Sequence, residues 1–98
     1  MNIVDTYKEG QILSVTVHSH FNLRTKKKIE SCLTPGISKL TINLINCNFI
    51  DSEGVIFLHE WLKSGNELLL KKPPPIFFEI LEILELDDLW DLDNIIIN

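Results

Sequence analysis

The spacing of apolar side chains predicts four β-strands along the chain. Residues 2–7 and 11–17 form the first two, and the segment Lys8-Glu9-Gly10 between them favours a tight hairpin turn. Residues 39–45 alternate apolar and polar positions, which is typical of a strand with one buried face. Residues 67–71 contain three consecutive leucines, and this run predicts a central strand that is buried on both faces.

Three further segments have the periodicity of amphipathic helices. The first covers residues 23–33, with Asn22 as its N-cap, and a Pro-Gly pair stops it. The second covers about residues 53–63 and ends at a Ser-Gly pair, where glycine suits the left-handed C-cap. The third follows the three prolines at residues 73–75. Its apolar side chains, spaced i, i+3, i+4 and i+7, are Phe77, Ile80, Leu81 and Leu84.

The order of these elements is β-β-α-β-α-β-α, which predicts a single α/β domain over residues 1–98. Short links between them require one antiparallel hairpin beside parallel strand pairs, hence a mixed sheet of four to five strands with three to four helices. Residues 87–91 are compatible with one more helical turn. Residues 94–98 are rich in isoleucine and prone to form a strand, but the pattern does not place the segment Ile95–Ile97.

The charge balance argues against nucleic-acid binding. The chain of 98 residues has a net charge of −5, and its one basic cluster is Lys26-Lys27-Lys28, whereas binding to phosphates needs a basic surface. The N-terminal residues show no signal-peptide pattern, and no apolar run approaches the length of a membrane span. Cys32 and Cys47 fit no metal or disulfide pattern. We therefore expect a cytoplasmic protein with reduced thiols.

The tetrapeptide Asp51-Ser52-Glu53-Gly54 carries the most functional information. It lies between a buried strand and an amphipathic helix, so Ser52 is expected at the helix N-terminus, where a hydroxyl can cap the first turn. A phosphoryl group at the same place would face unpaired N–H groups at the positive end of the helix dipole. Ser52 can thus be a plain cap, a switchable charge, or both.

The whole order of elements, with Phe49-Ile50-Asp51-Ser52-x-Gly54 before the second helix, resembles the STAS domain family. This family includes bacterial anti-sigma factor antagonists and a module of anion transporters. Residues 19–25 resemble the family's Gly-x-Leu-Asp-x-x-Thr segment, which opens the first helix. They depart from it twice, because Ser19 replaces the glycine and Asn22 replaces the aspartate. These departures weaken the expectation of that family's usual kinase partnership.

The resemblance implies a regulatory binding protein rather than an enzyme, without a cofactor or a bound metal. Ser52 falls on the family's phosphoacceptor position. The implied partners are a serine kinase with the histidine-kinase-like ATPase fold, acting as an anti-sigma factor, and a phosphatase that restores the serine. The surface expected to meet the partner consists of Asn22, Asp51, Ser52, Glu53 and Gly54. The alternative is a structural STAS subunit of a lipid-transport ABC complex or a signalling scaffold, without phosphorylation control.

Two other chemistries fit the sequence less well. His18 and His20 share one face of a strand, a spacing that a metal can use, but no further ligand accompanies them in the sequence. Ser52 as a hydrolase nucleophile would need a glycine at the position of Ile50 and a base closer than His59, which lies two helical turns away. Neither a metal site nor a catalytic site is therefore expected.

Overall fold

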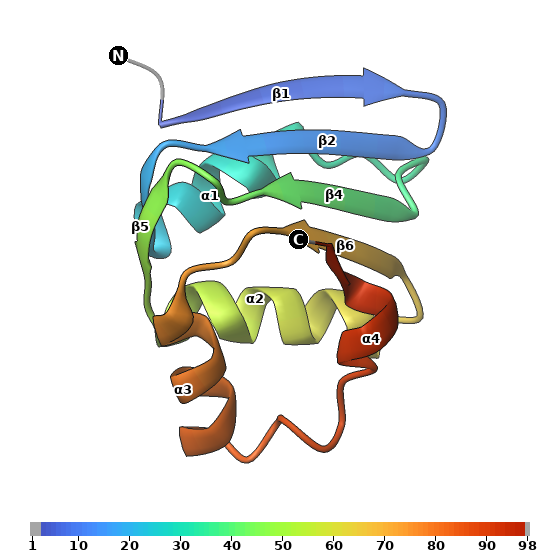
Figure 1. The fold of residues 1–98 in the computed structure, drawn as a ribbon. Helices are drawn as coiled ribbons and strands as arrows, with labels where there is room; N and C mark the ends of the chain where they lie inside the picture. Colours follow the sequence, from blue (N-terminus) through green and yellow to red (C-terminus); the bar gives the residue numbers. More distant parts are fainter. Residues whose placement is uncertain (1–2, 98) are drawn as a thin grey trace.

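A five-stranded mixed sheet forms the centre of the fold (Figure 1). The structure is a computed structural model and describes residues 3–97. The strand order in this sheet is β1-β2-β4-β6-β7. β1 and β2 pair in antiparallel orientation, and each other neighbouring pair is parallel. The strands are β1 (Val4–Glu9), β2 (Ile12–Val17), β4 (Lys39–Asn43), β6 (Glu67–Lys71) and β7 (Ile96–Ile97).

The predicted hairpin and the predicted mixed sheet are confirmed, with a shift at the turn. β1 continues through Glu9, which pairs with Ile12, so the turn itself consists of Gly10 and Gln11. Gly10 has a φ of 61°, a left-handed conformation that glycine adopts without steric cost. Glu9 was predicted in the turn because a charged residue is typical of a turn. β1 tolerates it because most of the strand's side chains are exposed.

Two helices cover one face of the sheet and bury its apolar positions. In Figure 1, α1 lies behind β2 and β4, and α2 lies below β6. The parallel register aligns Leu13, Leu40 and Leu68 in one buried row beneath them. Leu69 points to the opposite face and is only partly buried, so the prediction that the leucine run is buried on both faces is wrong. The helices are α1 (Leu23–Cys32), α2 (Ser52–Lys63), α3 (Pro75–Ile83) and α4 (Leu92–Ile95).

A second, two-stranded parallel sheet, which the apolar pattern did not predict, continues beyond the main one. It pairs β3 (Ser19–Phe21) with β5 (Cys47–Ile50). The apolar pattern placed no element between the predicted strand at residues 39–45 and the tetrapeptide before the second helix. Strands of three or four residues are too short to show a period of two, and here the pairing partner is far away in the sequence. This small sheet connects directly to the N-termini of α1 and α2.

The C-terminal segment returns to the main sheet. Residues 87–89 form a turn, and the extra helical turn with which residues 87–91 are compatible does not form. Trp90 is nevertheless buried, and its indole N–H donates to Nδ1 of His59 at 3.2 Å. The isoleucine-rich tail then supplies α4 and the edge strand β7, while Asn98 lies outside the described residues. Within residues 3–97, the structure contains no helix with the length and apolarity that crossing a membrane requires.

Candidate functional site

The N-terminus of α2 is capped by Asp51 and not by Ser52. Asp51 has an extended backbone, and its Oδ1 accepts a hydrogen bond from the amide of Gly54 at 3.1 Å. Ser52 is the first helical residue, so of the roles that the sequence left open for its hydroxyl, the helix cap is wrong. The carboxylate of Asp51, one position earlier in the chain, accepts the hydrogen bond from the free amide of Gly54 instead. Ser52 is exposed, and its hydroxyl makes no hydrogen bond to any residue that the structure describes.

The N-terminus of α1 is built in the same way. Asn22 is its N-cap, as predicted, and its Oδ1 accepts from the amide of Thr25 at 3.2 Å. Thr25 is a buried polar residue whose hydroxyl donates to the carbonyl oxygen of His20 at 2.6 Å. The hydroxyl thereby satisfies a backbone acceptor at the corner between β3 and α1. These two bonds hold the start of α1 in place.

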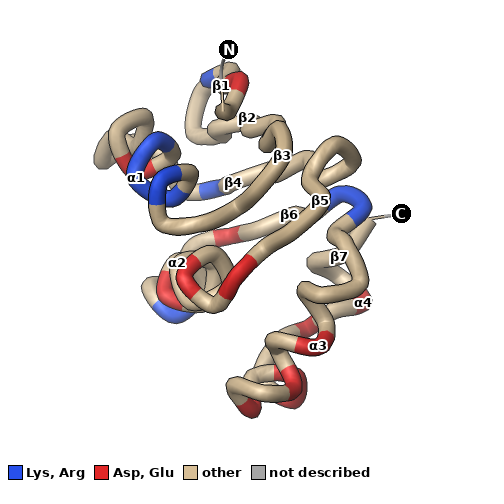
Figure 2. The backbone as a smooth tube through the Cα atoms, turned by 90° about the vertical axis from the view of Figure 1, so that its left-hand side faces the viewer, with Lys and Arg blue, Asp and Glu red and all other residues tan. Residues whose placement is uncertain are grey.

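The small sheet brings the two helix N-termini side by side. Phe21 and Ile50 are register partners, and the amide of Asp51 donates to the carbonyl oxygen of Phe21 at 3.2 Å. On the helices themselves, Nζ of Lys26 lies 3.9 Å from Oε2 of Glu53. Figure 2 looks onto this end of the molecule and shows the basic positions of α1 above the acidic positions of α2. Asn22, Asp51, Ser52 and Glu53 thus lie at the same end of the molecule, and their role in meeting a partner stays a prediction.

Gly54, the fifth residue predicted for the partner interface, lies beneath that surface. It is buried, and a Cβ atom on it would lie 2.8 Å from the backbone oxygen of Phe21 and 2.8 Å from Cγ1 of Ile50. Only glycine lets α2 approach the small sheet this closely. Gly54 is therefore a packing residue, and the expectation that it meets a partner directly is wrong.

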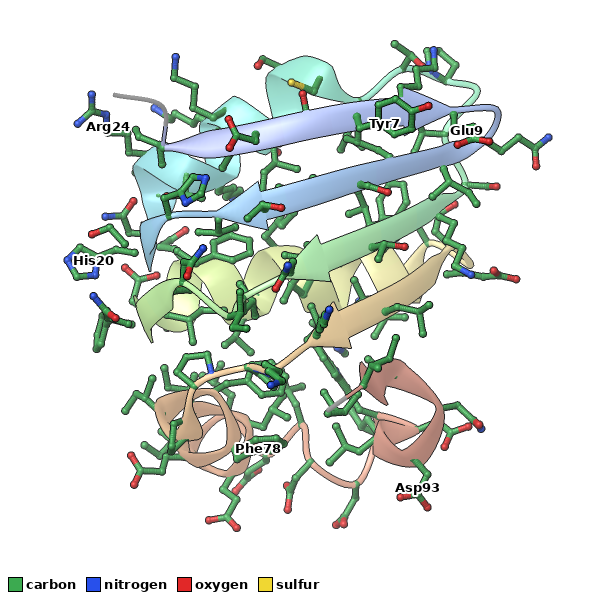
Figure 3. The ribbon with its side chains drawn as sticks, turned by 45° about the horizontal axis from the view of Figure 1, so that its top comes forward. Tyr7, Glu9, His20, Arg24, Phe78 and Asp93 are labelled. Carbon is green, nitrogen blue, oxygen red and sulfur yellow. The ribbon has the colours of Figure 1, made fainter. Side chains whose placement is uncertain are left out.

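Three exposed apolar side chains lie on the elements next to Ser52, and the sequence analysis did not find them. Leu23, Phe49 and Ile56 are 38 to 44 % exposed, at the start of α1, in β5 and one turn after Ser52. The ring of Phe49 also packs edge-on against His20, with 6.1 Å between the ring centroids. Figure 3 shows His20 and Arg24 projecting outward at this end. Ile56 lies off the buried face of α2, to which Val55 and Leu58 belong, and its position in the helical period was the available signal that it faces outward.

The other candidate chemistries use residues that already have structural partners. Nε2 of His18 lies 2.8 Å from Oδ2 of Asp5, whereas His20 packs on Phe49. Across residues 3–97, no group of three or more His, Cys, Asp and Glu side chains could hold a metal ion. Nδ1 of His59 accepts from Trp90. Burial raises the pKa of the Cys47 thiol, which favours its unreactive protonated form.

Ser19 replaces the glycine of the Gly-x-Leu-Asp-x-x-Thr pattern, and its backbone conformation explains why glycine suits that position. Its φ is 77°, in the left-handed region where a Cβ atom costs about 1–2 kcal/mol. We expect Ser19→Gly to stabilise the protein by about 0.5–1 kcal/mol, because the relief of strain exceeds the larger entropy of the unfolded glycine chain. Chemical denaturation checks this.

The matched control for Ser19 is Ser14→Gly. Ser14 lies in the middle of β2, where φ is not positive, so this substitution should destabilise the protein by about 0.5–1 kcal/mol. The same sign for both variants would show that the conformation of Ser19 carries no strain.

Comparison with known proteins agrees with this architecture. No protein-family description and no curated protein sequence matches the chain. Among solved structures, the Bacillus cell fate determinant SpoIIAA in its phosphorylated form aligns over 96 % of this chain and 88 % of its own, with a TM-score of 0.69 and 10 % identity. The anti-sigma factor antagonist SpoIIAA in its unphosphorylated form aligns over 96 % and 85 %, with a TM-score of 0.68 and 12 % identity.

A third structure, described as Mglu, aligns over 74 % of this chain but only 20 % of its own, with a TM-score of 0.56 and 17 % identity. At such low identities, these likenesses concern the fold. The protein has a STAS-like fold: a mixed α/β single domain with a five-stranded sheet and four helices over the described residues. The predicted fold class is confirmed.

Proposed function

We propose that this protein is a partner-switching regulator of the anti-sigma factor antagonist type, with Ser52 as the acceptor of a phosphoryl group. One observation carries the proposal: Ser52 is exposed at the start of α2 with its hydroxyl unbonded to any described residue, and α1, β5 and α2 each carry an exposed apolar side chain near their ends at this side. The likeness to SpoIIAA in both phosphorylation states supports it. The partners are a serine kinase that acts as the anti-sigma factor and a phosphatase.

In the proposed phosphoryl transfer, this protein contributes the acceptor hydroxyl and the kinase contributes the base. Oγ of Ser52 forms a bond to the γ-phosphorus of ATP, the bond from that phosphorus to the bridging β–γ oxygen breaks, and ADP leaves. The hydroxyl proton passes to a base of the kinase. The first amides of α2 have no partners within the helix and stabilise the negative charge of the product. The amide of Gly54 is already bonded to Asp51 and takes no part.

The surface changes its character when Ser52 is modified. Without phosphate, the apolar side chains of Leu23, Phe49 and Ile56 can be buried against a partner. A phosphoryl group adds a charge of about −1.5 to −2 beside the carboxylates of Asp51 and Glu53. Burying that charge at the centre of an interface costs desolvation and repulsion. The unmodified form therefore binds the partner, and the modified form is released.

The test is a pair of titrations against the cognate kinase, with and without ATP. We expect Ser52→Asp to weaken binding about tenfold or more, because like charge at an interface costs more than 1.4 kcal/mol. Ser52→Ala should bind as the wild type does and stay bound when ATP is added. Since Asp51 is the cap, Ser52→Ala should change the free energy of unfolding by no more than about 0.5 kcal/mol.

Ser38→Asp is the matched control, because Ser38 precedes β4 at the end of the sheet away from Ser52. It should leave binding unchanged. Equal binding by Ser52→Asp and Ser52→Ala, with no effect of ATP, would refute the switch. The surface would then be a constitutive contact of a structural subunit in a larger complex. The neutral side chain of Asn22, at a position where the resembling pattern has aspartate, is the observation that favours this second function.

A further inference from the structure

Lys26 is held beside Glu53, the chain neighbour of the candidate phosphoacceptor, by the packing of α1 against α2. Its side chain is 25 % exposed, and its Nζ lies 3.9 Å from Oε2 of Glu53, the residue next to Ser52. Its backbone amide donates to the carbonyl oxygen of the N-cap Asn22 at 2.9 Å, so Lys26 belongs to the ordered first turn of α1. Lys27 and Lys28, which follow it, are exposed.

The distance between Lys26 and Glu53 describes a loose ion pair. At 3.9 Å the two charged atoms attract each other without a short hydrogen bond, and half of the Glu53 side chain is exposed to water. The ammonium group of such a pair readily moves from the carboxylate to a nearby anion of larger charge. The charged and titratable groups at this end are Asp51 and Glu53 on the segment of Ser52, Arg24 and Lys26 on α1, and His20 in β3. Asp51 is committed to the helix cap.

We propose that Lys26 is the intrachain counter-ion of phosphorylated Ser52, moving from Glu53 to the phosphoryl oxygens when the serine is modified. This rests on the proposed function for the modification itself. A phosphoryl group carries a larger charge than a carboxylate and has three acceptor oxygens, so it competes for the ammonium group. Lys26 thereby offsets part of the repulsion from Asp51 and Glu53, and it draws the phosphate toward the protein's own surface.

The experiment uses the full chain with phosphoserine inserted at position 52 during translation, so that it needs no kinase. Phosphorus NMR follows the second ionisation of the phosphate against pH. We expect Lys26→Gln to raise the pKa of the phosphate about twice as much as Lys27→Gln, because a nearby cation favours the dianion and distance weakens this effect. Lys27→Gln is the matched control, with the same charge change on the same helix.

A second measurement guards against an effect on the fold alone. Thermal melts should show that Lys26→Gln lowers the Tm of the phosphorylated protein more than that of the unmodified protein, and that 1 M salt reduces this difference. Equal rises in the pKa of the phosphate for Lys26→Gln and Lys27→Gln, or equal Tm losses with and without phosphate, would overturn the proposal.

The outcomes separate this inference from the proposed function. If a kinase modifies Ser52 and the partner is released, but Lys26→Gln and Lys27→Gln raise the pKa of the phosphate equally, the switch is supported and the role of Lys26 is refuted. If no kinase modifies Ser52, yet only Lys26→Gln raises the pKa of the inserted phosphate strongly, the role of Lys26 stands and the partner switch falls.

Discussion

Replacing Leu81 with alanine is expected to destabilise the protein by about 2–5 kcal/mol, the usual range for removing a fully buried leucine. Leu81 lies on the inward stripe of α3 and is buried together with Phe77, which itself packs against Trp90. The substitution removes apolar contacts and leaves a cavity where α3 meets the rest of the core. Chemical denaturation with a linear extrapolation measures the loss.

Glu82→Ala is the control for this prediction. Glu82 is the next residue of α3 and is exposed, so its removal should change the free energy of unfolding by less than about 0.5 kcal/mol. Similar losses for both variants would show that the apolar stripe of α3 faces another direction.

Replacing Gly54 with alanine is expected to destabilise the protein by about 2 kcal/mol, although alanine is the better helix former. Better helix propensity contributes about 1 kcal/mol, but forcing a methyl group into a filled space costs about 3 kcal/mol at the upper end of the usual range. The upper end applies because one of the atoms at 2.8 Å is the backbone oxygen of Phe21, which cannot rotate away. Thermal and chemical denaturation measure this loss.

Gly36→Ala is the matched control for Gly54. No atom lies within 4 Å of a Cβ at Gly36, and its φ is not positive, so alanine there should be tolerated within about 0.5 kcal/mol. If Gly54→Ala were equally well tolerated, α2 would not depend on this close approach to the small sheet.

The elements predicted best are those with a long, regular pattern. Residues 67–71 were predicted as a strand and are β6, and the apolar spacing from Phe77 onward correctly predicted the buried face of α3. Asn22 was recognised as a cap because its short polar side chain precedes an amphipathic run. In each case the signal lies within a few neighbouring residues, where local geometry decides the structure.

The candidate site was predicted in its residues but not in its details. The sequence placed Ser52 at a helix N-terminus, which the structure confirms to within one position. It offered the hydroxyl of Ser52 as one possible cap, because serine and aspartate are both good caps and composition alone does not choose between adjacent ones. Only the extended backbone of Asp51 and its bond to Gly54 decide this.

The sequence by itself determined an α/β chain with a capped first helix and an exposed serine opening the second, because turns, caps and periodicity are encoded in adjacent residues. Only the tertiary structure decided which distant segments meet. It paired β3 with β5, which placed Phe21 against Ile50 and made glycine necessary at Gly54. It also brought Lys26 to Glu53. Such contacts depend on strand order and on close packing between elements, and neither can be seen from one residue to the next.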